Sequence, residues 1–586
     1  REDGAGLAAR SLSRPAHAGW EDAAVPPDRL GAYLRDFEAL LRGHGLDGVP
    51  YGHFGDGCVH VRIDFGLRES DGPAAFRRFL DEAAALVASY GGTLSGEHGD
   101  GRARSSLLGA MYAPDVLDLF RRAKAICDPQ GILNPGVLVD PRPAEADLKL
   151  AGPLREPPRA LRWAHDRGSV IDAVHRCTGV GKCLAPPQGS VMCPSFEATR
   201  DEKDSTRGRA RVLQEMVDGR LVGDGWRSQE VHDALDLCLA CKACSSDCPT
   251  GIDMATYKVE ALHQRYRRRL RPRSHYTLGA LPRWLRLSPS ARLAAWLLSS
   301  PLVQRLAKSA AGVDHRRRIP VPAAKSARQW VRRNRPAHPR PDVVIWTDTF
   351  TEHFTPDNAR AAVAVLEAAG LTVSFVGERV CCGLTWVSTG QLGAARREMR
   401  RTLDALHPYV ERGIPVLALE PSCLATLRAD VAELLDDPRA AEVAAHTYTL
   451  AELLTGLDGW TPPDLTGVEV VAQPHCHHHS VLGWEADAAL LTRAGARLTR
   501  VDGCCGLAGN FGVEQGHYEV SVAVAEAHLL PAVLGAGESA VVLADGFSCR
   551  TQLDDLAGVR SQHLAELLAD RLAHERRAAE AAAKAP

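Results

Sequence analysis

The chain has 586 residues and a formal net charge of −2, with 70 Lys and Arg against 72 Asp and Glu. A near-neutral charge argues against bulk nucleic-acid binding, and this length predicts three or four domains rather than one core. Sixteen cysteines in metal-type spacings on a large chain indicate a reducing cytoplasm rather than a disulfide scaffold. No run of 18 apolar residues predicts a membrane-spanning helix, and no signal peptide is visible. Because the sequence opens on Arg1 rather than Met, we expect a fragment or a processed product.

The first part of the chain, residues 1–145, mixes strand and helix patterns. Residues 59–65 alternate apolar and polar side chains, as a half-buried strand does. Residues 73–90 and 113–127 have the pattern of helices. An α+β domain is therefore expected here.

Two motifs in this part contain residues that can bind a metal. His53 and His60 are seven residues apart across a glycine-rich turn, so their imidazoles can point into one site. Glu97 and His98 follow in a second glycine-rich segment, 95–101. Two histidines and one carboxylate suit a divalent ion such as Zn, Mn or Fe. Loop histidines with ordinary hydrogen bonds are the alternative, and they would be preferred for either motif alone.

The next part, residues 160–260, has the cysteine spacing of an iron–sulfur protein among short helices. A Cys-x2-Cys-x2-Cys-x3-Cys-Pro motif follows a partner with altered spacing, and the cysteines are Cys177, Cys183, Cys193, Cys238, Cys241, Cys244 and Cys248. In two-cluster proteins the fourth cysteine of such a motif ligates the other cluster. We therefore expect Cys193 to complete the set of Cys238, Cys241 and Cys244, and Cys248 to join Cys177 and Cys183. Buried free thiols are the alternative, but they rarely produce this spacing twice.

The second of these sets lacks one cysteine, because the missing position is occupied by Val180. An aliphatic residue there resembles the three-iron site of succinate dehydrogenase-type proteins. One 4Fe-4S cluster is therefore expected beside a second cluster, which is either 3Fe-4S or 4Fe-4S with a ligand from outside the motif.

Residues 261–341 are strongly basic, with 20 Lys or Arg against one acid, Asp314. Apolar residues such as Trp284 and Trp296 interleave with these charges. One interpretation is a solvated helical linker, and another is a basic amphipathic surface that touches anionic lipid or an acidic partner. A third is that the arginines neutralise acidic faces of the neighbouring domains.

Residues 342–570 contain an internal repeat. Strand-like residues 343–346 match 469–472 at an offset of 126, and the Cys-Cys-Gly triplet at 381–383 matches the one at 504–506. Each half begins with a strand, continues through a helix and has another strand before its last cysteine. The helices are expected at 358–369 and 484–495. Two pseudo-symmetric α/β lobes are the natural fold.

The two histidine motifs and the segment Ile-Leu-Asn-Pro-Gly at 132–136 resemble the C-terminal catalytic half of FAD-linked D-2-hydroxyacid dehydrogenases, the family of D-lactate, glycolate and D-2-hydroxyglutarate dehydrogenases. The order of oxidase half, ferredoxin and paired Cys-Cys-Gly domain is similar to the long bacterial fusions with FAD-binding and Fe–S-binding domains. The resemblance covers almost the whole chain. It implies that FAD is held mainly by an N-terminal half that precedes this region.

The resemblance also implies roles for individual residues. The metal ligands would be His53, His60 and Glu97. The general base would be His98, and Arg1 would bind the substrate carboxylate. Asn134, in the closing segment, would lie near the flavin. Some relatives have a lysine near position 20, where this chain has Trp20, so the carboxylate clamp is expected to differ.

The repeat region is similar to the cysteine-rich Cys-Cys-Gly domains of heterodisulfide reductase and glycolate oxidase Fe–S subunits. The second half keeps enough cysteines for a cofactor or redox site, namely Cys476, Cys504, Cys505 and Cys549. The first half has Phe350 where the repeat places Cys476, and keeps only Cys381, Cys382 and Cys423. A scaffold of buried thiols is the alternative. A zinc or supporting role is a weaker hypothesis for the neighbouring His475, His477, His478 and His479.

These observations predict a multi-domain α+β oxidoreductase. A catalytic FAD-linked oxidase C-terminal domain is expected at 1–145 and an α-helical ferredoxin domain at 160–260. A basic helical linker at 261–341 and a duplicated cysteine-rich domain at 342–570 follow. The expected reaction is oxidation of a D-2-hydroxy acid, D-2-hydroxyglutarate or D-lactate, with electrons passing from FAD through Fe–S clusters to a quinone or a redox protein rather than to NAD. The alternatives are a non-catalytic electron-transfer component of a heterodisulfide reductase-like or glycolate oxidase-like complex, and a basic membrane-docked scaffold. We expect a cytoplasmic protein, with peripheral contact at the inner face of the cell membrane left open.

Overall fold

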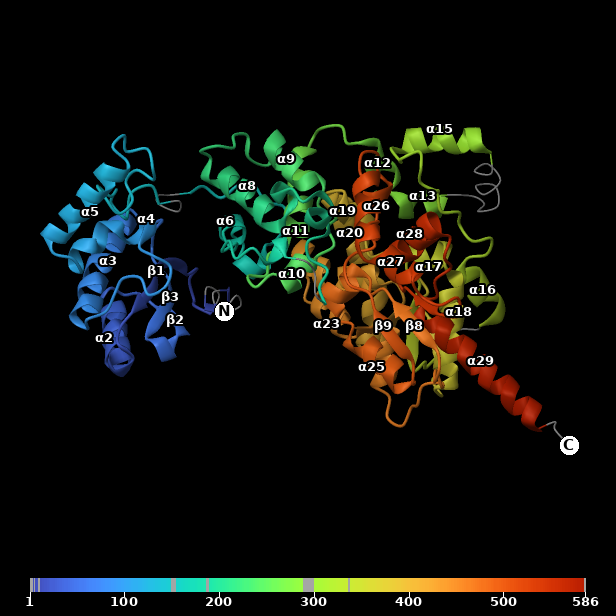
Figure 1. Ribbon diagram of the computed structural model, residues 1–586. Coiled ribbons are helices and arrows are strands. Elements are labelled where there is room, and N and C mark those ends of the chain that lie inside the picture. The colour runs from blue at the N-terminus through green and yellow to red at the C-terminus, as the bar shows by residue number, and fades with distance from the viewer. Residues whose placement is uncertain are drawn as a thin grey trace. The chain divides into compact units, whose positions relative to one another are not determined.

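The protein is described here from a computed structural model (Figure 1). The structure describes residues 4, 6–8, 11–148, 154–185, 189–287, 300–335 and 338–583. The chain divides into two compact units, the first made of residues 1–156 with 174–180 and 217–221, and the second of the remaining residues. Small sheets among many helices confirm the predicted multi-domain α+β class. No disulfide links any of the sixteen cysteines, all of which are described.

The first unit is built on a three-stranded antiparallel sheet with the order β1-β3-β2. The strands are β1 (His17–Ala24), β2 (Gly48–His53) and β3 (Cys58–Ile63). In the central strand, His60 pairs with Glu21 on one side and with Tyr51 on the other. Side chains alternate along a strand, so Val59 and Val61 enter the core while His60 lies on the opposite face.

Two amphipathic helices, α2 (Leu30–Gly43) and α3 (Gly72–Ser89), supply much of the rest of this core. Phe37 of α2 and Phe79 of α3 meet edge to face, with ring centroids 6.1 Å apart, a geometry that aromatic pairs favour. The helix α3 confirms the prediction for 73–90, and α5 (Pro114–Cys127) confirms the one for 113–127. Unlike α2 and α3, α5 has no buried residue.

The ferredoxin-like segment consists of helices joined by loops (Figure 1). These helices are α6 (Val170–Val174), α7 (Pro194–Thr199), α8 (Thr206–Asp218), α9 (Gln229–Asp236), α10 (Ala243–Asp247) and α11 (Met254–Arg265). Helix α11 begins with a cap, since the Asp253 carboxylate accepts a hydrogen bond from the backbone N–H of Thr256.

The cysteine-rich segment contains two parallel sheets that repeat the same order. In the first half β4 (Val343–Trp346) lies between β5 (Val373–Phe375) and β6 (Val416–Ala418), and β7 (Thr447–Tyr448) extends the edge. The second half places β8 (Glu469–Ala472) between β9 (Arg497–Arg500) and β10 (Val541–Leu543). Both sheets contribute to one hydrophobic core. The predicted pseudo-symmetric lobes are therefore confirmed.

The helices of the two halves follow the expected positions. Those predicted at 358–369 and 484–495 are α18 (Pro356–Ala368) and α25 (Glu485–Arg493). The other helices are α17 (Thr349–His353), α19 (Leu384–Ser388), α20 (Leu392–Val410), α21 (Pro421–Ala425), α22 (Val431–Leu434), α23 (Arg439–Ala445), α24 (Leu450–Thr455), α26 (Tyr518–Ala527), α27 (Leu529–Leu534), α28 (Phe547–Ala557) and α29 (Leu564–Ala583). The C-terminal α29 packs against α18, so the end of the chain closes the core of the first half.

The basic stretch forms helices α12 (Arg273–Thr277), α13 (Leu281–Leu287), α15 (Pro301–Ala311) and α16 (Ala327–Asn334). Several of its arginines pair with acids of the cysteine-rich segment: Arg286 with Glu398, Arg316 with Glu519, Arg317 with Asp555, and Arg335 with Glu367. Neutralisation of neighbouring acidic faces thus accounts for part of this charge. Trp296 lies outside the described residues. Among the helices that the structure describes, none is both long and apolar enough to cross a membrane.

Candidate functional site

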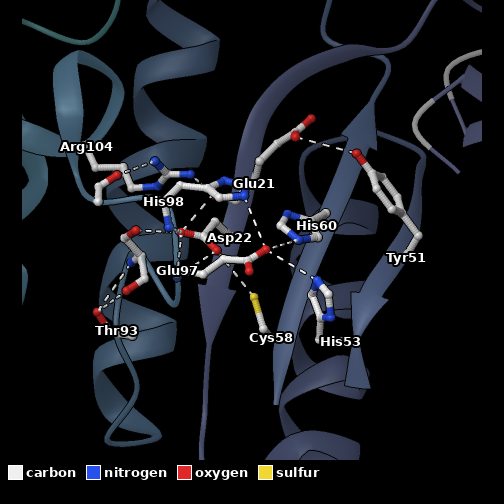
Figure 2. Close-up of polar contacts among 12 residues, drawn as sticks. Glu21, Asp22, Tyr51, His53, Cys58, His60, Thr93, Glu97, His98 and Arg104 are labelled. Carbon is white, nitrogen blue, oxygen red and sulfur yellow. Dashed lines mark hydrogen bonds and ion pairs between the residues drawn. The ribbon is translucent and has the colours of Figure 1, made fainter. Parts of the chain in front are cut away.

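Three imidazoles surround one carboxylate oxygen in the first unit (Figure 2). Glu97 Oε1 lies 3.3 Å from His53 Nε2, 3.6 Å from His60 Nε2 and 3.2 Å from His98 Nε2. The rings of His60 and His98 are stacked, with centroids 5.2 Å apart. His60 is 3% exposed, whereas the other three residues are more than a third exposed. The cluster is thus buried at its base and open on one side.

The hairpin of β2 and β3 and the loop before α4 (Gly101–Arg104) bring these residues together. His53 ends β2 and His60 lies in the middle of β3, so the hairpin places both imidazoles on the site. Gly52 directly precedes His53 in β2 and has φ +143. A Cβ at this position would clash with the backbone carbonyl oxygen of Cys58, at 2.7 Å. A glycine is therefore required at that position.

A buried carboxylate on β1, which the sequence analysis did not identify, holds the loop that bears Glu97 and His98. Asp22 is 0% exposed and accepts hydrogen bonds from Ser95 Oγ at 2.5 Å, from the backbone N–H of Glu97 and, at 2.8 Å, from that of His98. Burial by itself raises the pKa of Asp22, but the hydrogen bonds from Ser95, His98 and Glu97 outweigh it, so the pKa lies below its usual value. Asp22 is therefore an ionised anchor for the loop.

A second acidic residue of β1, Glu21, lies beside the cluster with two arginines. Arg62 Nε is 3.0 Å from Glu21 Oε1, and Arg104 donates a hydrogen bond to the Glu21 backbone carbonyl. Burial raises the pKa of Glu21, although Arg62 and Arg104 oppose this shift. Arg1, which the sequence analysis assigned to the substrate carboxylate, lies outside the described residues. Arg62 and Arg104 are the cations that the structure places at this site.

The donor set fits a divalent metal ion. Imidazole nitrogens and carboxylate oxygens are the ligands that Zn, Mn and Fe(II) accept. The atoms that lie within 4.8 Å of one another belong to Asp22, His60, Glu97 and His98. This group contains the predicted ligands His60 and Glu97, and also His98, the predicted base. It does not contain His53, the third predicted ligand. The ligand set therefore stays a prediction.

Asn134 lies in an exposed turn after α5, in the left-handed conformation with φ 50. Asp128 organises this turn by accepting the backbone N–H groups of Ile132 and Leu133. Both of these side chains are exposed, as are Leu119 and Ile126 of α5. The turn and the helix thus each expose apolar side chains.

The first predicted cluster set lies within the second unit and is buried as a whole, with Cys193, Cys238, Cys241 and Cys244 each less than 10% exposed. The guanidinium of Arg209 is 3.7 Å from Cys193 Sγ and is itself 1% exposed. Burial opposes its charge, but Cys238 and Cys193 keep the pKa of Arg209 above its usual value. A buried cation beside three thiols of the set, those of Cys238, Cys193 and Cys244, fits an anionic iron–sulfur cluster, because buried charges need a counter-charge.

The loop of this cysteine set is tied to the cysteine-rich segment by a buried ion network. Lys242 Nζ lies 2.9 Å from Asp430 and 3.2 Å from Asp253. Burial and the thiols of Cys476 and Cys244 raise the pKa of Cys241, which places the first set next to a cysteine of the second half.

Two cysteines of the second predicted set, Cys183 and Cys248, lie in the second unit. Cys183 is buried and its sulfur accepts the backbone N–H of Arg207 at 3.3 Å, whereas Cys248 lies 3.3 Å from Thr250 Oγ1. Cys177 is in segment 174–180 of the first unit, beside Val180, whose side chain is 40% exposed. The composition of this cluster stays a prediction.

The four cysteines of the second half converge, since Cys504 interacts with Cys476 and Cys505, and Cys505 interacts with Cys549. All four are less than 5% exposed. Hydrogen bonds with Cys504 and Cys549 hold the pKa of Cys505 well below its usual value. Four convergent sulfurs with one favoured thiolate fit a metal or cluster site, because thiolates are the ligating form.

The first half differs in its fourth position. Cys382 Sγ lies 3.1 Å from Cys423 Sγ, and Cys381 is adjacent. At the position equivalent to Cys476, the ring of Phe350 stacks on Phe547 with centroids 5.0 Å apart. The histidines around Cys476 have other partners: His477 contacts the carbonyl of Ala240, His479 contacts Asp247, and His478 lies 3.3 Å from Asp487.

Comparison with known protein families matches three parts of the chain. Residues 2–138 match the C-terminal domain of FAD linked oxidases. The first unit carries that domain. Residues 165–252 match the 4Fe-4S dicluster domain, and residues 348–428 match the Cysteine-rich domain. The chain thus combines a flavin-oxidase domain with an iron–sulfur domain, as the sequence resemblance implied.

Curated proteins of related name match the chain over most of its length. The chain is 27% identical to the D-2-hydroxyglutarate dehydrogenases of Escherichia coli and of Pseudomonas putida, over 94% of this chain and 58% of each relative. It is 25% identical to the probable glycolate oxidase iron-sulfur subunit of Bacillus subtilis, over 70% of this chain and 96% of that subunit. The chain therefore spans little more than half the length of the D-2-hydroxyglutarate dehydrogenases that it matches.

Proposed function

We propose that the protein oxidises a D-2-hydroxy acid, with D-2-hydroxyglutarate and D-lactate as the leading substrates, and passes the electrons through iron–sulfur clusters to an acceptor. The observation that carries the proposal is the arrangement of three imidazole nitrogens around Glu97 Oε1 in a flavin-oxidase domain. The names of the relatives that match 94% of the chain support this substrate class.

The roles of the residues follow from their positions. A divalent ion held by His53, His60 and Glu97 would supply a positive charge for the substrate hydroxyl and carboxylate, and FAD would accept the hydride from C2. His98 would take the hydroxyl proton on Nε2, while Asp22 holds its backbone in place. Arg62 and Arg104 lie on the same side of β1 as the cluster and would attract the carboxylates of the substrate.

We infer that the exposed apolar surface of α5 and the turn at Asn134 packs against the part of the enzyme that holds the flavin. Helix α5 exposes 57% of Leu119 and 82% of Ile126, and the turn exposes 69% of Ile132 and 62% of Leu133. Exposed apolar side chains that gather in one patch usually mark an interaction site. Asn134 follows Leu133 in the turn, and the family resemblance places it near the flavin.

A non-catalytic electron carrier is the competing function. Such a carrier would keep the cysteine sets, but it has no use for the cluster of His53, His60, Glu97 and His98. Substrate binding discriminates the two functions. In Mn²⁺-loaded protein, D-2-hydroxyglutarate should perturb the Mn²⁺ EPR spectrum, while L-2-hydroxyglutarate should do so only weakly. The same spectra from His60→Ala protein should show no bound Mn²⁺. An unperturbed spectrum with every D-2-hydroxy acid tested would favour the carrier.

We also propose peripheral contact with an anionic membrane. Helices α13 and α15 expose Trp284, Leu287, Leu302 and Leu306 beside arginine and lysine residues. Each Lys or Arg near an anionic surface contributes about 1 kcal/mol, and salt screens this attraction. The protein should therefore float with phosphatidylglycerol vesicles at low salt and not at high salt. If it ignores these vesicles at low salt, the stretch is an internal linker.

A further inference from the structure

The second unit contains a cavity of about 600 Å³ that adjoins two of the predicted cysteine sites and extends beyond them. Its walls come from four segments that are far apart in the sequence: the cysteine loop at Cys238, the start of the basic stretch at His275, and both halves of the cysteine-rich segment, at Phe350 and at Cys476. A cavity of this size can hold one medium-sized organic molecule.

Two wall residues belong to the proposed cofactor sites. Cys238 is a member of the complete ferredoxin set, and Cys476 is a member of the convergent set in the second half. Both sets thus reach the wall of the same cavity. A molecule in the cavity would therefore lie beside two electron carriers at once.

One wall is aromatic. Phe547 lies between Phe350 and Phe354, with ring centroids 5.0 Å and 5.1 Å away. Phe350 occupies the position that the repeat gives to Cys476, so the first half has an aromatic ring where the second half has a cofactor ligand. Stacked aromatic rings favour a flat, unsaturated molecule rather than a flexible polar one.

Hydrogen-bonding groups lie on other parts of the lining. His275 is 6% exposed, and its Nδ1 is 3.4 Å from the Arg271 guanidinium, which can only donate. The imidazole proton therefore belongs on Nε2, which can donate to a carbonyl oxygen. Burial, with the nearby Arg271 and Lys258, lowers the pKa of His275 to about 3, so the ring stays neutral. Ser422 and Glu420 add a hydroxyl and a carboxyl to the lining.

Part of the lining is aliphatic. Leu278 and Leu281 line the cavity, and Leu281 is the first residue of α13, which exposes Trp284 and Leu287. One short segment thus contributes leucines to the cavity and, a few residues further on, exposed apolar side chains. Aliphatic lining of this kind suits a molecule with a hydrocarbon tail.

We propose that this cavity binds a quinone and is the place where electrons leave the protein. The proposal rests on the proposed function, which delivers electrons to the cysteine sets. The quinone would receive two electrons, one at a time, from the carriers beside Cys238 and Cys476, and two protons from solvent by way of the polar lining. Its two carbonyl groups become hydroxyl groups, and the quinol leaves. His275 Nε2 would hold one carbonyl, and the ring would stack on the aromatic wall.

The decisive experiment starts from cluster-loaded protein reduced with dithionite, so that it does not depend on hydroxy-acid oxidation. Re-oxidation of the clusters is followed by stopped-flow absorbance with decylubiquinone, and with ferricyanide as an acceptor that needs no pocket. Wild-type protein should show saturable re-oxidation by the quinone. In Leu278→Trp the indole fills the cavity, and the quinone reaction should slow at least tenfold while the ferricyanide reaction is unchanged.

Leu270→Trp is the matched control, because Leu270 lies in the same stretch, is 89% exposed and does not line the cavity. It should behave as wild type with both acceptors. The proposal would be overturned if Leu278→Trp reacted with the quinone at the wild-type rate, or if the quinone reaction of wild-type protein were not saturable. It would also be overturned if glutathione disulfide, rather than the quinone, gave saturable re-oxidation. None of these results bears on whether the first unit oxidises a hydroxy acid.

A second measurement needs no variant and reports binding rather than turnover. A photoreactive azidoquinone should label peptides that contain residues 266–281 or 350–354, and excess decylubiquinone should protect them. Labelling confined to other parts of the chain would overturn the proposal even if Leu278→Trp fails to fold.

Discussion

The backbone N–H of His98 donates a 2.8 Å hydrogen bond to the buried carboxylate of Asp22, across 76 residues of sequence. The same carboxylate accepts the N–H of Glu97 and the hydroxyl of Ser95. One side chain of β1 thus orients two residues of the candidate metal site without being a predicted ligand. Partners of this kind tune metal sites nearly as strongly as the ligands do.

Asp22→Asn should weaken metal binding by roughly 10–100-fold, the usual cost of losing a partner that orients the ligands. The amide cannot accept as many hydrogen bonds as the carboxylate, so the loop from Ser95 to His98 loses its anchor. Titration with Mn²⁺ followed by EPR measures the affinity. Asp64→Asn is the control, because Asp64 is equally buried but pairs with Arg14 instead. Equal Mn²⁺ affinities for Asp22→Asn and wild type would show that the loop does not need this anchor.

His98→Ala should retain the metal and lose turnover by roughly 10²–10⁴, the usual contribution of a general base. The geometry makes this a sharp test, because His98 Nε2 lies as close to Glu97 as His53 Nε2 does. Metal content by mass spectrometry and the rate with D-2-hydroxyglutarate are measured together. His44→Ala serves as control, since His44 belongs to the same unit and pairs with Glu82. Loss of the metal in His98→Ala would make His98 a ligand rather than the base.

The sequence motifs predicted most of the candidate site but not its support. His53 and His60 flank a tight hairpin, and Glu97 and His98 are neighbours, so local spacing was enough to group them. Asp22 acts through backbone N–H groups of a distant loop, and no spacing rule identifies such a residue. Arg62 could be placed on the face of β3 that bears His60 by alternation alone, but its pairing with Glu21 depends on strand register.

The cysteine-rich fold was predictable for a different reason. A repeat with an offset of 126 residues places matching strands in matching sheets, and β5-β4-β6 indeed has the same order as β9-β8-β10. The large cavity was not predictable, because its wall combines residues as distant as Cys238, His275 and Phe547. Only tertiary packing brings them together.

The ferredoxin segment should hold two clusters of different type, because Val180 occupies the position of a ligand. Anaerobically reconstituted protein should show a [3Fe–4S] EPR signal when oxidised and a [4Fe–4S] signal when reduced. Val180→Cys should abolish the oxidised [3Fe–4S] signal and convert that cluster to [4Fe–4S], since it supplies the missing thiolate. Two equivalent [4Fe–4S] spectra in the unmodified protein would contradict the asymmetry.

Lys242→Met should destabilise the cluster-loaded protein by about 3–5 kcal/mol, the usual effect of breaking a buried ion pair from one side. The substitution leaves the buried Asp430 and the partly buried Asp253 without their shared cation. Chemical denaturation followed by cluster absorbance measures the change. Lys325→Met, at an exposed lysine of the same unit, should change little. Equal stability of Lys242→Met and wild type would mean that desolvation cancels the attraction in this network.

The central claim is that electrons from a D-2-hydroxy acid enter at the histidine cluster and reach the iron–sulfur clusters. Its most direct test is a single anaerobic turnover of the holoprotein, loaded with FAD, metal and clusters, and frozen for EPR after addition of D-2-hydroxyglutarate or D-lactate. At least one of the two should produce reduced-cluster signals in wild type, the L-enantiomer should not, and His60→Ala should give none although dithionite still reduces its clusters. Clusters that stay oxidised with both D-2-hydroxy acids, or that His60→Ala reduces as fast as wild type does, would contradict the account.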